Sequence, residues 1–220
     1  MKIVETLLWV IGGTLMLVFL GGLTLAEYNR SSDVAEFRAQ LAQASPSTTQ
    51  QSSPVAAQTA SFDVNMEDLD KALWSEGRKA HFEESLTQEA GPVMALLEIP
   101  ALDLEVPVYD GASELHMNLG IARIEGTAQL GEDGNLGMAG HRDGFFRVLK
   151  DIKYGDELLL TTMDGVLTYK VDELQIVDPS AIEVLNDRGR ASITLVTCYP
   201  FYFVGHAPER FIVHATLQET

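Results

Sequence analysis

Short apolar runs at close intervals dominate the chain from Pro92 onwards and constrain its fold more than any other feature. Turn-forming residues separate these runs, and Asp164-Gly165 is typical of a tight hairpin. The candidate strands are residues 93–99, 106–109, 121–124, 136–139, 158–162, 167–177, 193–197 and 211–217. Only residues 113–119 and 145–149 have the character of helical turns. Because strands and helices do not alternate regularly, the pattern favours an antiparallel barrel or sandwich. The side chains of a barrel this small fill its interior, so any chemistry is expected on its rim.

The N-terminal residues 7–26 form a run of 20 residues without a charged side chain. At about 1.5 Å per residue, a helix of this length spans a hydrocarbon core of roughly 30 Å. We expect a transmembrane anchor rather than a cleaved signal peptide, whose apolar core is about 7–15 residues long. The short N-terminal tail is expected to stay in the cytoplasm, which places the remaining chain on the outer side of the membrane, at a cell surface or in a periplasm.

Two changes of composition separate this apolar run from the strands. Residues 44–61 are rich in Ser, Thr, Gln and Pro and carry no charge, which predicts a flexible tether. Residues 63–89 contain apolar side chains at helical spacing, which predicts a helix that packs on the following domain. The expected organisation is a membrane anchor at 1–30, a tether at 31–62, this helix at 63–91 and a β domain at 92–220.

The charge balance and the cysteine content exclude several classes of function. The chain has 32 Asp and Glu against 15 Lys and Arg. Nucleic acids and anionic membrane surfaces both select basic faces, so neither is expected as the main partner. The single cysteine, Cys198, excludes an internal disulfide and a zinc site built from cysteine pairs. None of the five histidines has the spacing of a metal ligand.

Cys198 follows the apolar, β-branched run 193–196, which predicts a buried strand that ends before Pro200. Arg210 begins the next apolar run, so the two strand ends are expected to place a thiol beside a guanidinium. A lone cysteine is more often a small core residue, and composition alone favours that interpretation. Arg210 and a histidine at a third strand end favour a nucleophile instead.

That histidine is His141, which directly follows a predicted strand. Gly140 and Gly144 are expected to let the backbone turn sharply, so that the imidazole projects from the strand end. A thiol with a pKa of about 8.5 is only a few per cent thiolate at neutral pH and needs a base or a positive charge nearby. His141 can exchange a proton, whereas Arg210 stays protonated and suits an oxyanion. Together with Cys198 they predict acyl transfer through a thioester.

These segments resemble a known family. Residues 194–198 (TLVTC) resemble the TLxTC strand of sortases, residues 140–142 (GHR) resemble their histidine segment, and Arg210 follows the cysteine as their essential arginine does. The wider segments 139–146 and 197–211 are most similar to class D sortases, with the related Gram-negative sortases next.

The resemblance implies a mainly β fold, a closed eight-stranded barrel with short helices, and a membrane-anchored cysteine transpeptidase. Such an enzyme cleaves an LPXTG-like sorting signal near the C-terminus of an exported protein, after the Thr. It implies that Cys198 attacks the Thr carbonyl, that Arg210 positions the peptide and its oxyanion, and that His141 protonates the leaving amine. An amine from a cell-wall precursor or a protein then resolves the thioester. Thr197 and the backbone N–H of Tyr199 are expected to contribute to the substrate and oxyanion pocket.

No cofactor or metal is predicted. Some relatives bind calcium near the substrate groove, but Glu132, Asp133 and Asp143 are interpreted here as surface acids of a very acidic chain. Two alternatives stay open: a cysteine endopeptidase, in which water resolves the thioester, and a non-catalytic domain that binds exported peptides. An L,D-transpeptidase is disfavoured because Pro200 stands where that class has an Arg.

Overall fold

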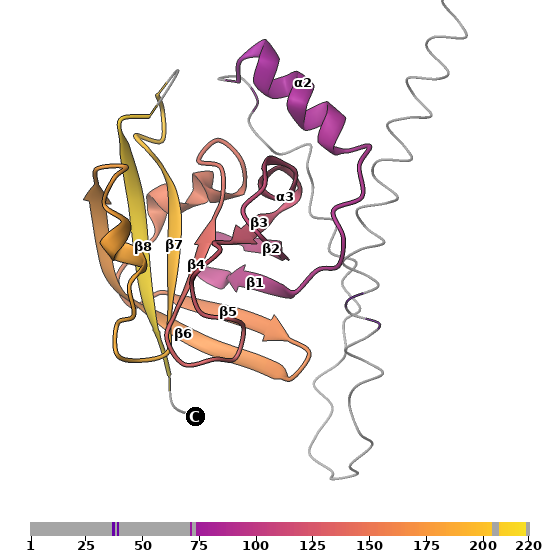
Figure 1. Cartoon of the computed structure of the whole chain (residues 1–220). Coiled ribbons are helices and arrows are strands. Elements are labelled where there is room, and N and C mark those ends of the chain that lie inside the picture. The colour runs from indigo at the N-terminus through magenta and orange to yellow at the C-terminus, as the bar shows by residue number, and fades with distance from the viewer. Residues whose placement is uncertain (1–36, 38, 40–70, 72–73, 204–206, 219–220) are drawn as a thin grey trace, which may run out of the picture.

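The computed structural model describes residues 37, 39, 71, 74–203 and 207–218 (Figure 1). The predicted anchor at 7–26 and the tether at 44–61 lie outside these residues, as does His206. Within the described ranges, no helix combines the length and the apolar character needed to cross a membrane.

Eight strands close into a barrel in the order β1-β2-β3-β4-β7-β8-β6-β5 (Figure 1). The strands are β1 (Ala95–Ile99), β2 (Leu104–Asp110), β3 (Ile121–Arg123), β4 (Asn135–Ala139), β5 (Glu157–Thr162), β6 (Gly165–Val177), β7 (Ser192–Tyr199) and β8 (Glu209–Leu217). Each overlaps one of the candidate strands, so the predicted number and positions are confirmed. The hairpin at Asp164-Gly165 is also confirmed, because Thr162 at the end of β5 pairs with Gly165 at the start of β6.

Two strand pairs are parallel, so the expectation of an antiparallel sheet is wrong for these pairs. β2 and β3 run parallel because the helix α3 (Glu114–Leu119) connects them as a crossover. β4 and β7 are also parallel, and they are distant in sequence. A parallel pair brings the C-terminal ends of both strands to the same edge of the sheet, and this fact determines where the site lies.

Successive side chains of β7 point alternately into the apolar core and to the opposite face of the sheet. On β7, Ile193 and Leu195 are fully buried in the core, whereas Val196 and Cys198 point to the other face and are partly exposed. Fully burying a side chain such as Leu or Ile contributes about 1.5–3 kcal/mol, so the register of β7 is strongly determined. A register shift by one residue would turn Cys198 into the core.

The remaining helices for which the structure gives complete bounds are short. They are α2 (Glu76–Ser85) and three 3₁₀ helices, η3 (Pro100–Leu102), η4 (Phe145–Asp151) and η5 (Ile182–Leu185). In the described part of the predicted 63–89 helix, α2 begins only at Glu76, because the Ser75 side chain caps it by accepting a hydrogen bond from the Arg78 N–H. α2 lies at one end of the barrel beyond α3, and the buried Asn118 Nδ2 of α3 donates to Ser85 Oγ at 2.7 Å (Figure 1).

Candidate active site

The pairing of β7 with β8 places Cys198 directly opposite Arg210. Directly opposed residues of an antiparallel pair have their side chains on the same face, about 4.5–5.5 Å apart at Cβ. The thiol is partly exposed on the outer face. The Arg210 Nη1 donates to the carbonyl oxygens of Glu209 at 3.0 Å and Ala207 at 3.4 Å, so the guanidinium also holds the chain that enters β8.

His141 lies level with Cys198 because β4 and β7 are parallel. Ala139 pairs with Val196, and the Gly140 N–H donates to the Val196 carbonyl at 3.2 Å. His141 and Cys198 each lie two residues beyond this last pair. Three adjacent strands, β4, β7 and β8, therefore bring the histidine, the cysteine and the arginine to one end of the barrel, as the sequence predicted.

Thr197 joins the cysteine strand to the histidine turn. Its side chain is buried, and its hydroxyl donates to the Gly140 carbonyl at 2.8 Å. This contact is internal to the fold, so the predicted contribution of Thr197 to the substrate pocket stays a prediction. The Tyr199 ring packs on Phe201 and Phe211, with centroid distances of 5.8 and 6.3 Å. Its backbone N–H as an oxyanion donor likewise stays a prediction.

Gly140 has a different role from the expected one. Its φ is not positive, so it does not occupy the left-handed region that favours glycine. A Cβ at Gly140 would lie 2.7 Å from the Phe146 ring, which is fully buried beneath the turn. Gly140 is therefore required for close packing of the His141 turn on the core.

The His141 side chain is surrounded by charged groups from three elements. Its Nε2 lies 3.3 Å from Glu114 Oε1 of α3, without the alignment of a hydrogen bond. Asp143 lies in the same turn, and Arg78 comes from α2. Burial lowers the pKa of His141, the Arg78 charge lowers it further, and Glu114 and Asp143 raise it. The net result is a pKa below the usual value for histidine.

Arg142 links the histidine turn to the loop that follows the cysteine. Its Nη1 donates to the Pro200 carbonyl at 2.9 Å, and its Nη2 donates to the Phe203 carbonyl at 2.6 Å. The guanidinium also lies 5.8 Å from the centroid of the Phe203 ring. One side chain thus fixes the position of residues 200–203 relative to His141.

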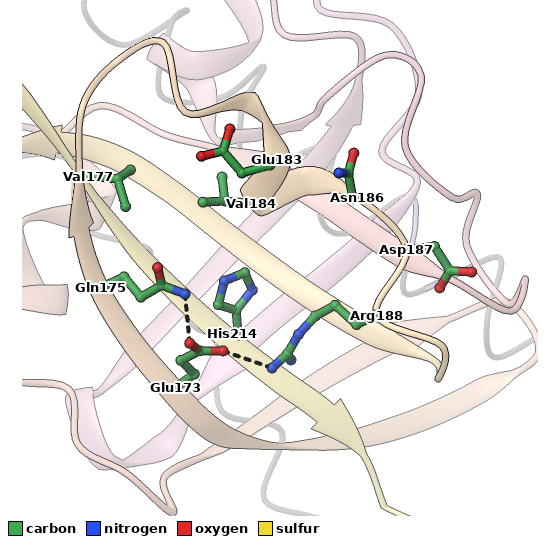
Figure 2. A pocket seen from close by; sticks show the side chains of 9 residues that line it. All are labelled: Glu173, Gln175, Val177, Glu183, Val184, Asn186, Asp187, Arg188 and His214. Carbon is green, nitrogen blue, oxygen red and sulfur yellow. Dashed lines mark hydrogen bonds and ion pairs between the residues drawn. The ribbon is translucent and has the colours of Figure 1, made fainter.

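A pocket of about 260 Å³ lies between β6, β8 and residues 183–188 (Figure 2). It is lined by Glu173, Gln175, Val177, Glu183, Val184, Asn186, Asp187, Arg188 and His214. The His214 ring stands in this pocket between Gln175 and Arg188 (Figure 2). Cys198, His141 and Arg210 do not line it.

A buried polar chain connects His214 to the segment between β6 and β7. Thr194 Oγ1 donates to Asn135 Oδ1 at 2.7 Å, so the same hydroxyl accepts a hydrogen bond from His214 Nδ1 at 2.8 Å. Asn135 Nδ2 in turn donates to the carbonyls of Val184 and Asn186. Burial lowers the pKa of His214, and the Arg188 charge acts in the same direction. The neutral ring is therefore the form that the fold favours.

Sequence reasoning did not find Arg78, Glu114, Arg142 or Asn135. Arg142 had a local signal, because it directly follows His141 in the segment already singled out. Glu114 and Arg78 had none, since the packing of α2 and α3 on the barrel end brings them to His141. Three or more metal-ligating side chains do not gather anywhere in the described part of the chain.

A closed β-barrel that presents a thiol, an imidazole and a guanidinium at one end has the architecture of a cysteine acyl-transfer enzyme. Comparison with known proteins agrees. The sortase domain model matches residues 97–218. Sortase D of Bacillus subtilis (strain 168) is 29% identical over 208 residues, which cover 94% of each chain.

Two further relatives extend this comparison. Sortase A of Streptococcus agalactiae (serotype III, strain NEM316) is 30% identical over 138 residues, or 59% of this chain and 54% of that protein. The solved structure of a Clostridium perfringens sortase D5 transpeptidase matches with a TM-score of 0.54 and 26% identity, covering 70% of this chain and 96% of that chain. The chain belongs to the sortase family. It is a cysteine transpeptidase, and the predicted family, the closed eight-stranded barrel and the enzyme class are confirmed.

Proposed function

We propose that this transpeptidase cleaves an LPXTG-like sorting signal of exported proteins and transfers the new acyl end to an amine. The Cys198 thiolate attacks the Thr carbonyl, a tetrahedral oxyanion forms, and the Thr–Gly bond breaks to leave a thioester. His141 gives its proton to the departing Gly amine. The acceptor amine then attacks the thioester, loses a proton to His141 and releases Cys198.

Arg210 is the group that we assign to the oxyanion. It carries a positive charge at every working pH, and its place opposite Cys198 is fixed by eight consecutive pairs between β7 and β8. The observation that carries this proposal is that the ends of β4, β7 and β8 lie side by side at one end of the barrel. The Thr197 hydroxyl of β7 donates to the Gly140 carbonyl that follows β4.

We further propose that residues 7–26 anchor the enzyme in the membrane with the N-terminus in the cytoplasm and the barrel outside. Support comes from the length of this uncharged run and from the exported nature of the substrates on which sortases act. The acceptor is an amine of a cell-wall precursor or of another protein.

Mass spectrometry of Cys198 tests the catalytic part. The full-length chain, in detergent micelles, is incubated with an LPXTG-type peptide, with and without a primary amine. We expect a thioester on Cys198 that converts to amine-capped peptide faster than to hydrolysed peptide. Cys198→Ala should bind peptide without turnover, and His141→Ala and Arg210→Ala should accumulate little product. Hydrolysis at the same rate with and without the amine would instead identify an endopeptidase. A folded protein whose thiol can be alkylated but forms no adduct with the peptide would indicate a peptide-binding domain.

A further inference from the structure

The helix α2 precedes the region that matches the sortase domain, yet it contacts the histidine turn. The Trp74 Nε1–H, just ahead of α2, donates to the Asp143 carbonyl at 3.0 Å. The Arg78 guanidinium stacks over the Trp74 ring at 4.2 Å, and Phe82 meets the same ring edge to face at 5.1 Å. The start of α2 is therefore packed directly on the segment that carries His141.

The Arg78 side chain carries its charge into this contact in a largely buried position. It is 14% exposed, and its Nε lies 3.8 Å from Asp143 Oδ1. Its Nε and Nη1 are buried and make no hydrogen bond to any residue that the structure describes. A buried cation without hydrogen bonds is costly and needs nearby negative charge, which Asp143 and Glu114 supply.

These charges balance when His141 is protonated. Arg78 contributes one positive charge, and Glu114 and Asp143 contribute one negative charge each, so the groups around a neutral ring carry a net charge of −1. An imidazolium brings the cluster to zero. Without Arg78 the net charge around the ring would be −2, and without the Glu114 carboxylate it would be zero.

We propose that Arg78 of α2 and Glu114 of α3 are positioning residues for His141, so that the N-terminal helix is a working part of the active site. The negative charge of Glu114 stabilises the His141 imidazolium. The positive charge of Arg78 weakens this stabilisation, so that the ring can release its proton. This inference rests on the proposed role of His141 as proton donor, but it concerns a property that is measurable without substrate.

The test is an NMR titration of the His141 ring in the full-length chain, assigned by comparison with His141→Gln. Arg78→Met removes the charge and keeps the length of the side chain, and we expect it to raise the pKa of His141. Glu114→Gln keeps the shape, and we expect it to lower the pKa further. Arg78→Lys keeps the positive charge, so we expect the pKa of His141 in this variant to stay close to the wild-type value. Trp74→Phe removes a hydrogen bond but no charge, and it is the matched control for loosened packing.

The opposite signs separate this proposal from a structural role. Loosening α2 exposes the ring and raises its pKa in every variant, so a rise in both Arg78→Met and Glu114→Gln, or no change in either, would overturn the proposal. The pH profile of kcat should follow the titration. At a pH above the pKa of His141, each unit by which that pKa falls lowers the fraction of imidazolium about tenfold. If the pKa of His141 shifts as expected but the wild-type protein shows no peptide turnover, the proposed function is rejected and the positioning role of Arg78 and Glu114 stands.

Discussion

Arg210 carries a permanent charge directly opposite the only cysteine in the chain. A lysine at this position would keep the charge and lose the planar fork of N–H donors. The planar fork also matters within the fold, because the guanidinium donates to the backbone carbonyls of Ala207, ahead of β8, and of Glu209, the first residue of β8. The same side chain thus holds the start of its own strand and lies opposite the cysteine at which we propose that the oxyanion forms.

We predict that Arg210→Lys lowers kcat by about 10²–10³, the cost of losing one well-placed oxyanion donor. The rate of Cys198 alkylation by a small reagent serves as the control, since it needs an exposed thiol but no oxyanion site. Peptide turnover and alkylation are measured on the same preparations. Equal losses in both would show that the variant disturbs the thiol itself, and undiminished turnover would contradict the assigned role.

At the scale of elements, the site depends on side-chain hydrogen bonds from two residues, each of which joins two neighbouring segments. The Thr197 hydroxyl binds the end of β7 to the start of the histidine turn, and Arg142 binds that turn to the loop after β7. Strand pairing alone stops before His141, so these side chains hold the part of the site that the sheet does not.

We predict that Arg142→Lys lowers turnover about tenfold and speeds hydrogen exchange at residues 201–203, because a lysine cannot bond both loop carbonyls in the same geometry. Exchange mass spectrometry and peptide turnover are measured together. Arg190→Lys, at an exposed ion pair with Asp172, is the matched control and should change neither. Faster exchange without a loss of turnover would show that this loop does not serve catalysis.

For the whole molecule, the buried His214 and the partly buried His141 make stability depend on pH. The pKa of His141 and that of His214 are both lowered in the folded protein, chiefly by burial. The unfolded chain therefore binds more protons than the folded chain between each lowered pKa and about 6.5. The stability that comes from keeping the rings neutral is fully present above that range and is lost as the pH falls through it.

We predict that His214→Asn, which preserves a donor for Thr194 at the Nδ1 position, flattens the fall in the free energy of unfolding as the pH drops below about 6.5. Denaturant unfolding at several pH values gives the comparison. The difference between variant and wild type is the quantity of interest, since protonation of the many carboxylates changes both proteins alike. Parallel curves at every pH would contradict the lowered pKa of His214.

The strands were predictable from sequence because their signals are local. Apolar runs ended by turn residues fixed all eight, and the order of Cys198 and Arg210 on adjoining runs placed them together. The parallel pairing of β7 with β4 was not predictable, because packing across the whole barrel decides which strand pairs with which. The same holds for Arg78 and Glu114, which reach His141 through helix docking and carry no pattern of their own.

The closed barrel also limits how a peptide can be read. β1 pairs with both β2 and β5, so the closed strand order leaves no terminal edge strand, the element to which an extended peptide most readily adds as a further strand. We therefore expect the proposed sorting signal to be recognised mainly by side chains and loop carbonyls at the barrel surface. Such a surface discriminates peptides by the shape and charge of their side chains. We expect an unrelated extended peptide to bind it only weakly.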